Sequence, residues 1–273
     1  PRDAIAALSI DALRYAQGLG LESVRALSQR LYAYNTLPLT PAWRRQYPDA
    51  RKVAEQLGLE PGGPNRRRLE SNWQAVQAEP RRDGWLTWRA RRPSSARSSG
   101  ETTYKLYVSP HPASLPDLLA DFAGVSGALG ALAFKVGRDA RGLLRPDKLV
   151  LYFARFDDLA QGAERLRPEL EGCPAQGVPF SAAITADGLL SWGADPPRAA
   201  QNLLPHVQES WRFWITNRLA RALLSARAAP SAEIEPWQFA LDRVRLEGVD
   251  TETWAPGQQM WAKYGPEMET RPW

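Results

Sequence analysis

The stretch that decides the fold is 133-AFKVGRDARGLLRPDKLVLYF-153, in which two apolar segments flank a charged connection. The β-branched and aromatic residues at both ends predict two strands, at about 132–137 and 147–154. Because the connection is short, we expect the two strands to pair as a hairpin. Lys135 stands between two apolar residues, so in a strand its side chain points to the face opposite to theirs.

Cations follow this lysine closely in the sequence, and they are Arg138, Arg141, Arg145 and Lys148. One interpretation is an exposed lysine on a half-solvated sheet, followed by a solvated loop. The other is a cleft in which several cations attract an anion. In such a cleft, desolvation and neighbouring cations lower the pKa of a lysine and can make it a general base.

The rest of the chain predicts an α+β fold with a helical N-terminal region followed by a mostly antiparallel sheet with flanking helices. Helical spacing of apolar residues begins at residue 3, and a further helix is expected from residue 65 to 77. After residue 80 strands and helices alternate, and the segments at 179–184 and 189–192 again look like a hairpin. We therefore expect a helical region over 1–80 and an α+β domain over 81–273.

The C-terminal third is expected to contain one long helix near 198–227. The tail after it holds four of the eleven tryptophans and shows little regular pattern. Indole rings bury a large apolar area, so we expect this tail to follow the surface and contribute its tryptophans to a core.

Composition excludes several classes of site. The chain has two histidines and one cysteine, which leaves no site built on several imidazoles or several thiolates, and no acidic cluster of the calcium-binding kind is evident. The glycine-rich phosphate-binding and dinucleotide-binding motifs are also missing from the sequence. We predict neither a metal nor a cofactor.

The net charge of +5 leaves three explanations open: an anionic substrate, a nucleic-acid partner, or a bias toward arginine codons. No apolar run approaches the length of a membrane-spanning helix, so no membrane contact is expected. The first residues look like an amphipathic helix and not a secretory leader. With one cysteine, a cytoplasmic protein is the expectation.

Three strings in order, YKLYVSP (104–110), FKVG (134–137) and LRPDKLVLYF (144–153), resemble the HopA-type family of bacterial effectors. They are also similar to the phosphothreonine-lyase effectors and to related lyases of lanthipeptide biosynthesis. Lys105 and Lys135 keep the spacing of about thirty residues between two strand positions in that group. The resemblance covers residues 103–197, and its motifs are short.

The resemblance implies a lyase-like protein that acts on a phosphorylated serine or threonine of a peptide. A strand lysine removes the α-proton, a histidine protonates the leaving phosphate and arginines hold it. Lys135 would be the base, and Arg145 would bind the phosphate. The acid position falls on Tyr107, which departs from the family, and His111 four residues later is the other candidate.

Lys105 and Lys148 complete the expected phosphate-binding set, while Asp147 could instead pair with an arginine and neutralise the site. The setting would be peptide natural-product biosynthesis or effector activity, and an effector would be secreted. The partner would be a peptide or protein. A non-catalytic module that binds a peptide or protein is the alternative function. A basic nucleic-acid binder is a third.

Overall fold

A computed structural model describes residues 3–76, 84–92, 102–197 and 209–261 of the 273-residue chain. The chain forms two compact units. The terminal unit comprises Pro1–Tyr34, Ser99–Thr103 and Gly177–Trp273, and the central unit comprises Asn35–Ser98 and Tyr104–Gln176. The fold is α+β, and the predicted order of a helical N-terminal region followed by an antiparallel sheet with flanking helices is confirmed.

Five helices form the N-terminal region: α1 (Ala4–Gln17), α2 (Val24–Tyr32), α3 (Pro41–Gln46), α4 (Ala50–Gln56) and α5 (Pro64–Glu70). The first four each begin after an aspartate, serine or threonine. That side chain accepts a hydrogen bond from the backbone N–H three residues later and so satisfies one of the unpaired donors at the helix start.

The central unit is built on five strands in the spatial order β1 (Trp73–Val76), β2 (Trp85–Ala90), β4 (Ala133–Gly137), β5 (Leu149–Phe153) and β3 (Tyr104–Val108). Every neighbouring pair among them is antiparallel, and the predicted β4–β5 hairpin is confirmed. Its connection contains a short helix, α7 (Ala140–Leu144). The helix expected over 65–77 is wrong in its second half, because α5 ends at Glu70 and β1 begins at Trp73.

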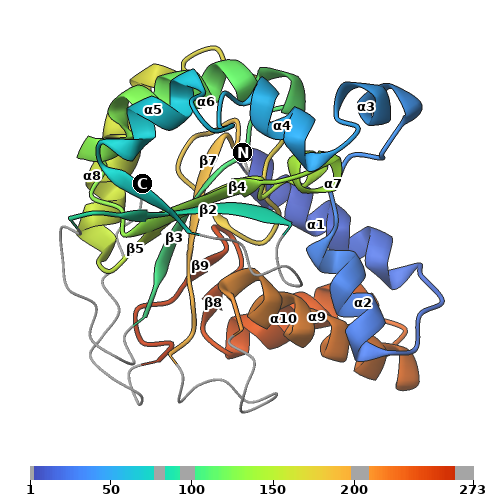
Figure 1. The fold of residues 1–273 in the computed structure, drawn as a ribbon. Coiled ribbons are helices and arrows are strands. Elements are labelled where there is room, and N and C mark those ends of the chain that lie inside the picture. The colour runs from blue at the N-terminus through green and yellow to red at the C-terminus, as the bar shows by residue number, and fades with distance from the viewer. Residues whose placement is uncertain (1–2, 77–83, 93–101, 198–208, 262–273) are drawn as a thin grey trace. The chain divides into compact units, whose positions relative to one another are not determined.

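One face of this sheet is covered by α5, α6 (Leu115–Val125) and α8 (Phe156–Leu166), as Figure 1 shows. Phe134 of β4 is the centre of that layer and is fully buried. Its ring lies 4.9 Å from that of Trp73, 6.0 Å from that of Trp88 and 5.0 Å from that of Phe122, measured between centroids. We call this side the helix-covered face. Alternation along the strand therefore directs Lys135 to the opposite side, the lysine face.

Three short 3₁₀ helices complete the connections of the central unit: Pro112–Ser114, Ser126–Ala128 and Pro168–Leu170. The terminal unit adds the hairpin β6 (Ala182–Ala183) and β7 (Leu190–Ala194), the helices α9 (Trp211–Ala228) and α10 (Pro236–Leu246), and the pair β8 (Val249–Asp250) and β9 (Ala255–Pro256). Helix α9 packs against α2 and α10.

Helix α9 covers the later part of the helix predicted near 198–227, and residues 198–208 lie outside the described residues. The tail beyond 228 is more regular than expected, because it contains α10. Within the described parts of the chain, no helix is both long enough and apolar enough to cross a membrane.

Candidate functional site

Two lysines lie on the lysine face of the central sheet with a tyrosine between them. In the strand register Lys105 of β3 stands opposite Tyr152 of β5, and Lys135 of β4 stands opposite Val150, two residues before that tyrosine. The Lys105 Nζ atom is 5.4 Å from the centroid of the Tyr152 ring, and the Lys135 Nζ atom is 5.8 Å from it. An aromatic ring attracts cations through its quadrupole, so one phenol ring holds both ammonium groups on the same face.

A tryptophan of the neighbouring strand brings the predicted base and the predicted phosphate ligand together. Trp85, the first residue of β2, pairs with Gly137 of β4. The Lys135 Nζ atom lies 4.1 Å from the centroid of the indole ring, and the Arg145 Cζ atom lies 5.0 Å from it. Lys135 and Arg145 therefore contact the same indole ring although they are ten positions apart in the chain.

The position of Arg145 follows from a helix that rests on the lysine-bearing strand. Asp139 begins α7 by accepting a hydrogen bond from the Gly142 N–H at 2.8 Å, and Arg145 ends α7 in the extended backbone conformation that precedes a proline. A side chain at Gly137 would place its Cβ atom 2.5 Å from the carbonyl carbon of Gly142. The main chains of α7 and β4 are therefore in direct contact.

Asp147 binds Arg145 through two parallel hydrogen bonds. The Arg145 Nε donates to Oδ1 and the Nη2 donates to Oδ2, both at 2.8 Å. The carboxylate is buried and the guanidinium is one-third exposed. The pairing of Asp147 with an arginine, one of the two possibilities raised by the sequence, is the one observed. It orients the guanidinium and offsets part of its charge.

Lys148 is not brought to the lysine pair but is bound inside the central unit. Its side chain is fully buried, and its Nζ donates to the Pro110 carbonyl at 2.7 Å and to the Gln176 Oε1 at 2.5 Å. Burial lowers the pKa of this ammonium to about 7, against the raising effect of Asp147 and Cys173. The geometry makes Lys148 a connection between three segments of the chain.

The two candidates for the acid lie in different places. Tyr107 is buried on the lysine face, in the same row of the sheet as Lys135, because both stand opposite Val150. His111 follows the end of β3, is exposed, and has its ring 6.2 Å from that of Trp43. Tyr107, and not His111, therefore has a position in the sheet in the same row as Lys135.

Trp85 and Tyr152 are the site residues that the sequence did not single out. One signal was available: only five lysines stand among the 35 basic residues, and three of them are Lys105, Lys135 and Lys148. An arginine stays protonated in proteins, whereas a lysine can lose its proton. The rarity of lysine in this arginine-rich chain is therefore a signal for candidate bases. Among the described residues no cluster of three or more metal-ligating side chains occurs.

The chain is similar in structure to an effector protein from Pseudomonas syringae pv. tomato strain DC3000, with 12% identity, a TM-score of 0.54, and coverage of 92% of this chain and 98% of that one. An effector protein from Pseudomonas syringae pv. syringae strain 61 matches at 12% identity and a TM-score of 0.52, covering 92% and 96%. The chain shares the fold of these effectors. The predicted relation to the HopA-type effectors is thus confirmed at the level of the fold.

A phosphothreonine lyase, an effector protein from Salmonella, matches with 14% identity and a TM-score of 0.39, over 77% of this chain and 98% of that one. No protein-family model matches the chain, and no curated protein sequence matches it significantly.

Proposed function

We propose that this protein removes phosphate from a phosphoserine or phosphothreonine of a peptide by β-elimination, with Lys135 as the base. The observation that carries the proposal is the meeting of Lys135 and Arg145 over the Trp85 ring, at 4.1 and 5.0 Å. A base and a phosphate-binding cation held by one aromatic side chain are the two groups that this reaction needs. The fold is shared with two bacterial effector proteins.

In the proposed reaction the neutral amine of Lys135 takes the proton from the α-carbon of the substrate residue. The electron pair of that C–H bond forms the double bond between the α- and β-carbons. The bond from the β-carbon to the phosphate oxygen breaks, and the phosphate leaves with its electron pair. The products are a dehydroamino acid in the peptide and inorganic phosphate, so atoms and charge balance.

Arg145 and Lys105 stabilise the departing phosphate, because fixed cations interact most strongly with the charge that develops on the leaving oxygens. Tyr107 supplies the proton for that oxygen. Phenols have an ordinary pKa near 10, so Tyr107 is a weaker acid than the histidine of the lyase group. We therefore expect slow turnover in comparison with an enzyme that carries a histidine there.

A second candidate function is a module that binds a phosphopeptide without cleaving it. The Arg145–Asp147 pair favours it, because two hydrogen bonds of the guanidinium are already directed at a carboxylate. The buried tyrosine at the acid position favours it as well. In this function the same cations recognise phosphate, and no bond in the peptide changes.

One experiment separates the two functions. The protein is incubated with phosphoserine and phosphothreonine peptides, and mass spectrometry follows the loss of phosphoric acid while fluorescence polarisation follows binding. Elimination by the wild type and its loss in Lys135→Ala, with binding retained, support the lyase. Binding without any dehydroamino product supports the module, and the absence of both rejects the two together.

A further inference from the structure

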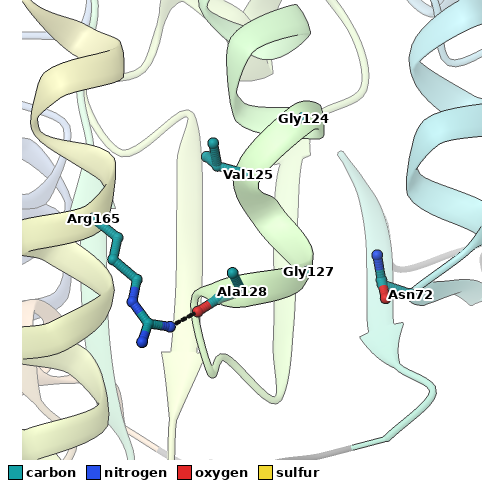
Figure 2. A pocket seen from close by; sticks show the side chains of 6 residues that line it. All are labelled: Asn72, Gly124, Val125, Gly127, Ala128 and Arg165. Carbon is teal, nitrogen blue, oxygen red and sulfur yellow. Dashed lines mark hydrogen bonds between the residues drawn. The ribbon is translucent and has the colours of Figure 1, made fainter.

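Two adjoining hollows lie on the helix-covered side of the central unit, where edge strand β1 begins. The first has a volume of about 590 Å³ and is lined by residues that include Asn72, Gly127 and Arg165. Figure 2 shows Arg165 extending from α8 toward the Ala128 carbonyl, with Asn72 on the other side of the Gly124–Ala128 segment. The second hollow, about 450 Å³, shares Asn72 and Gly127 and adds Arg91 and Arg92. We call the two together the edge groove.

Among the described residues, the edge groove is lined by cations and by no carboxylate. Its charged residues are Arg91, Arg92 and Arg165, all exposed. Within the described parts of the chain none of the three forms an ion pair, whereas Arg66 and Arg167 nearby are paired with Glu70 and Glu164. An anion that enters the groove therefore meets guanidinium groups that no internal carboxylate offsets.

Two of these guanidinium groups are oriented by the main chain. The Nε of Arg91 donates to the Glu70 carbonyl at 2.9 Å and to the Trp73 carbonyl at 3.2 Å. Arg165 donates through Nη1 to the Ala128 carbonyl. Each guanidinium has five N–H donors, so these contacts fix its direction and leave other donors for a ligand. Ordering before binding reduces the entropy that binding costs.

We propose that the edge groove binds an acidic segment of the peptide substrate. A carboxylate matches the planar fork of arginine in a bidentate pair, and several arginines in one groove match several glutamates or aspartates. The identity of the ligand as part of the substrate rests on the proposed function. The binding of acidic peptide by the groove does not.

The register of the sheet sets the distance from the edge groove to Lys135. Strand β1 is two strands away from β4, which is about 10 Å. Trp73 at the groove pairs with Ala90 of β2, and Lys135 pairs with Thr87 of the same strand. The three positions between Ala90 and Thr87 add about 10 Å along the strands. The straight-line separation is therefore about 14 Å, which extended chain covers in four to five residues at about 3.3 Å each.

A bound peptide must also pass around edge strand β1, because the groove lies on the helix-covered face and Lys135 on the lysine face. That detour adds a few residues. The acidic segment is accordingly expected about five to eight residues from the phosphorylated residue, on one side of it in the sequence.

The test uses two fluorescein-labelled, unphosphorylated ten-residue peptides, one rich in glutamate and one with glutamine at the same positions. Fluorescence polarisation is measured with the wild type, with Arg91→Gln/Arg92→Gln and with Arg165→Gln. The matched control is Arg44→Gln/Arg45→Gln, which removes the same charge from the exposed α3 of the same unit. Thermal melting checks that each variant is folded.

We expect the glutamate peptide to bind the wild type, and the Arg91/Arg92 variant to bind it at least tenfold more weakly. Arg165→Gln should weaken binding severalfold, and the α3 control less than twofold. Equal binding of the glutamate and glutamine peptides overturns the proposal. An equal loss of affinity in the α3 control also overturns the proposal. Binding would then depend only on the net charge of the protein and not on the arginines of the groove. Tighter binding of a single-stranded DNA of the same charge, with the same dependence on Arg91 and Arg92, overturns it in favour of nucleic acid.

Phosphopeptides with the acidic segment two or six residues from the phosphothreonine provide the link to catalysis. The longer spacing should lower KM in the wild type and lose that advantage in Arg91→Gln/Arg92→Gln. If the wild type eliminates no phosphate but binds the glutamate peptide through these arginines, the proposed function fails and the groove stands. If the wild type eliminates phosphate at the same KM for both spacings, the groove is not a substrate-binding site, and the proposed lyase function is retained.

Discussion

The Nζ atom of Lys135 lies 4.1 Å from the centre of the Trp85 ring, and the Cζ atom of Arg145 lies 5.0 Å from the same centre. Such a cation–π contact contributes about 0.5–2 kcal/mol. Trp85→Leu should therefore weaken phosphopeptide binding by about 3- to 30-fold, because both cations lose the ring that holds them. Trp85→Phe should retain most of the affinity.

Fluorescence polarisation with a labelled phosphopeptide measures this effect. The control is Trp237→Leu, which removes a different cation–π pair, with Arg14 at 4.8 Å, in the terminal unit. Equal affinity of Trp85→Leu and the wild type would show that the indole has no part in holding the two cations.

Replacement of the proposed base tests the chemistry directly. Lys135→Ala should lower the rate of phosphate release by at least about 100-fold, since a positioned base contributes about 10²- to 10⁴-fold. Lys135→Arg keeps the positive charge but not the ability to lose a proton, so it should bind substrate and remain inactive. Release of inorganic phosphate is the measurement, and Lys52→Ala on the exposed α4 is the control. Activity in Lys135→Arg close to that of the wild type would rule out this lysine as the base.

Substitutions of the two residues in the Arg145–Asp147 pair should change phosphopeptide affinity in opposite directions. Arg145→Gln should weaken phosphopeptide binding about tenfold, because a charged hydrogen-bonding partner of the phosphate is lost. Asp147→Asn should strengthen it severalfold, because the guanidinium no longer faces a carboxylate. Isothermal titration with phosphopeptide measures both, and Asp157→Asn, which removes the exposed pair with Arg155, is the control. A loss of affinity in a folded Asp147→Asn variant would mean that the positioning of Arg145 by this carboxylate outweighs its competition with the ligand.

Lys148 predicts a dependence of stability on pH. Its pKa is about 7 in the folded protein and near 10.5 when unfolded, so between these values the unfolded state holds the extra proton. The free energy of unfolding contributed by this group therefore rises with pH from about 7 to 10.5, by up to about 1.4 kcal/mol per pH unit. Below pH 7 both states are protonated, and the contribution stays at its lowest value.

Urea unfolding at pH 7, 8 and 9 compares the wild type with Lys148→Met, both in a Cys173→Ser background because that thiol interacts electrostatically with Lys148. The methionine variant should show a smaller rise in stability with pH. Identical slopes in the two proteins would mean that the buried amine does not change its protonation in this window.

Phe134 makes a prediction about the core alone. Its ring is fully buried among Trp73, Trp88 and Phe122, so Phe134→Ala should cost about 3–5 kcal/mol in the free energy of unfolding. Phe134→Leu should cost less because it leaves a smaller cavity. Urea unfolding measures both, with Leu246→Ala at an exposed position of α10 as the control. A cost for Phe134→Ala as small as that of the control would mean that this aromatic layer is not tightly packed.

Local patterns were sufficient for the strands that carry the lysines. Alternation around Lys135 predicted both the strand and the direction of the side chain, and the sheet register agrees. The strand at Trp73–Val76 was missed because nothing within it distinguishes it from the end of α5. Its strand structure depends on pairing with β2 and on the contact of Trp73 with Phe134, both distant in sequence. Helix α10 was missed although the capping box at Glu235 and Gln238 was present as a local signal.

For the site, the sequence could suggest which residue types matter but not which of them meet. Lys148 and Arg145 are three residues apart and looked equivalent, yet one is bound to Pro110 and Gln176 and the other lies over Trp85. That difference depends on where each side chain points at the start of β5. Trp85 could not be assigned either, because its role follows from pairing across the sheet.

The contact between Gly137 and Gly142 has a consequence for how such a protein can change over time. Because the backbones of β4 and α7 touch there, the separation of positions 135 and 145 is set by the main chain and not by the side chains at those positions. Mutations can therefore exchange the chemical groups at both points while the frame that spaces them stays the same. A scaffold of this kind can gain or lose an activity by point substitution, whereas any larger residue at 137 would alter the frame itself.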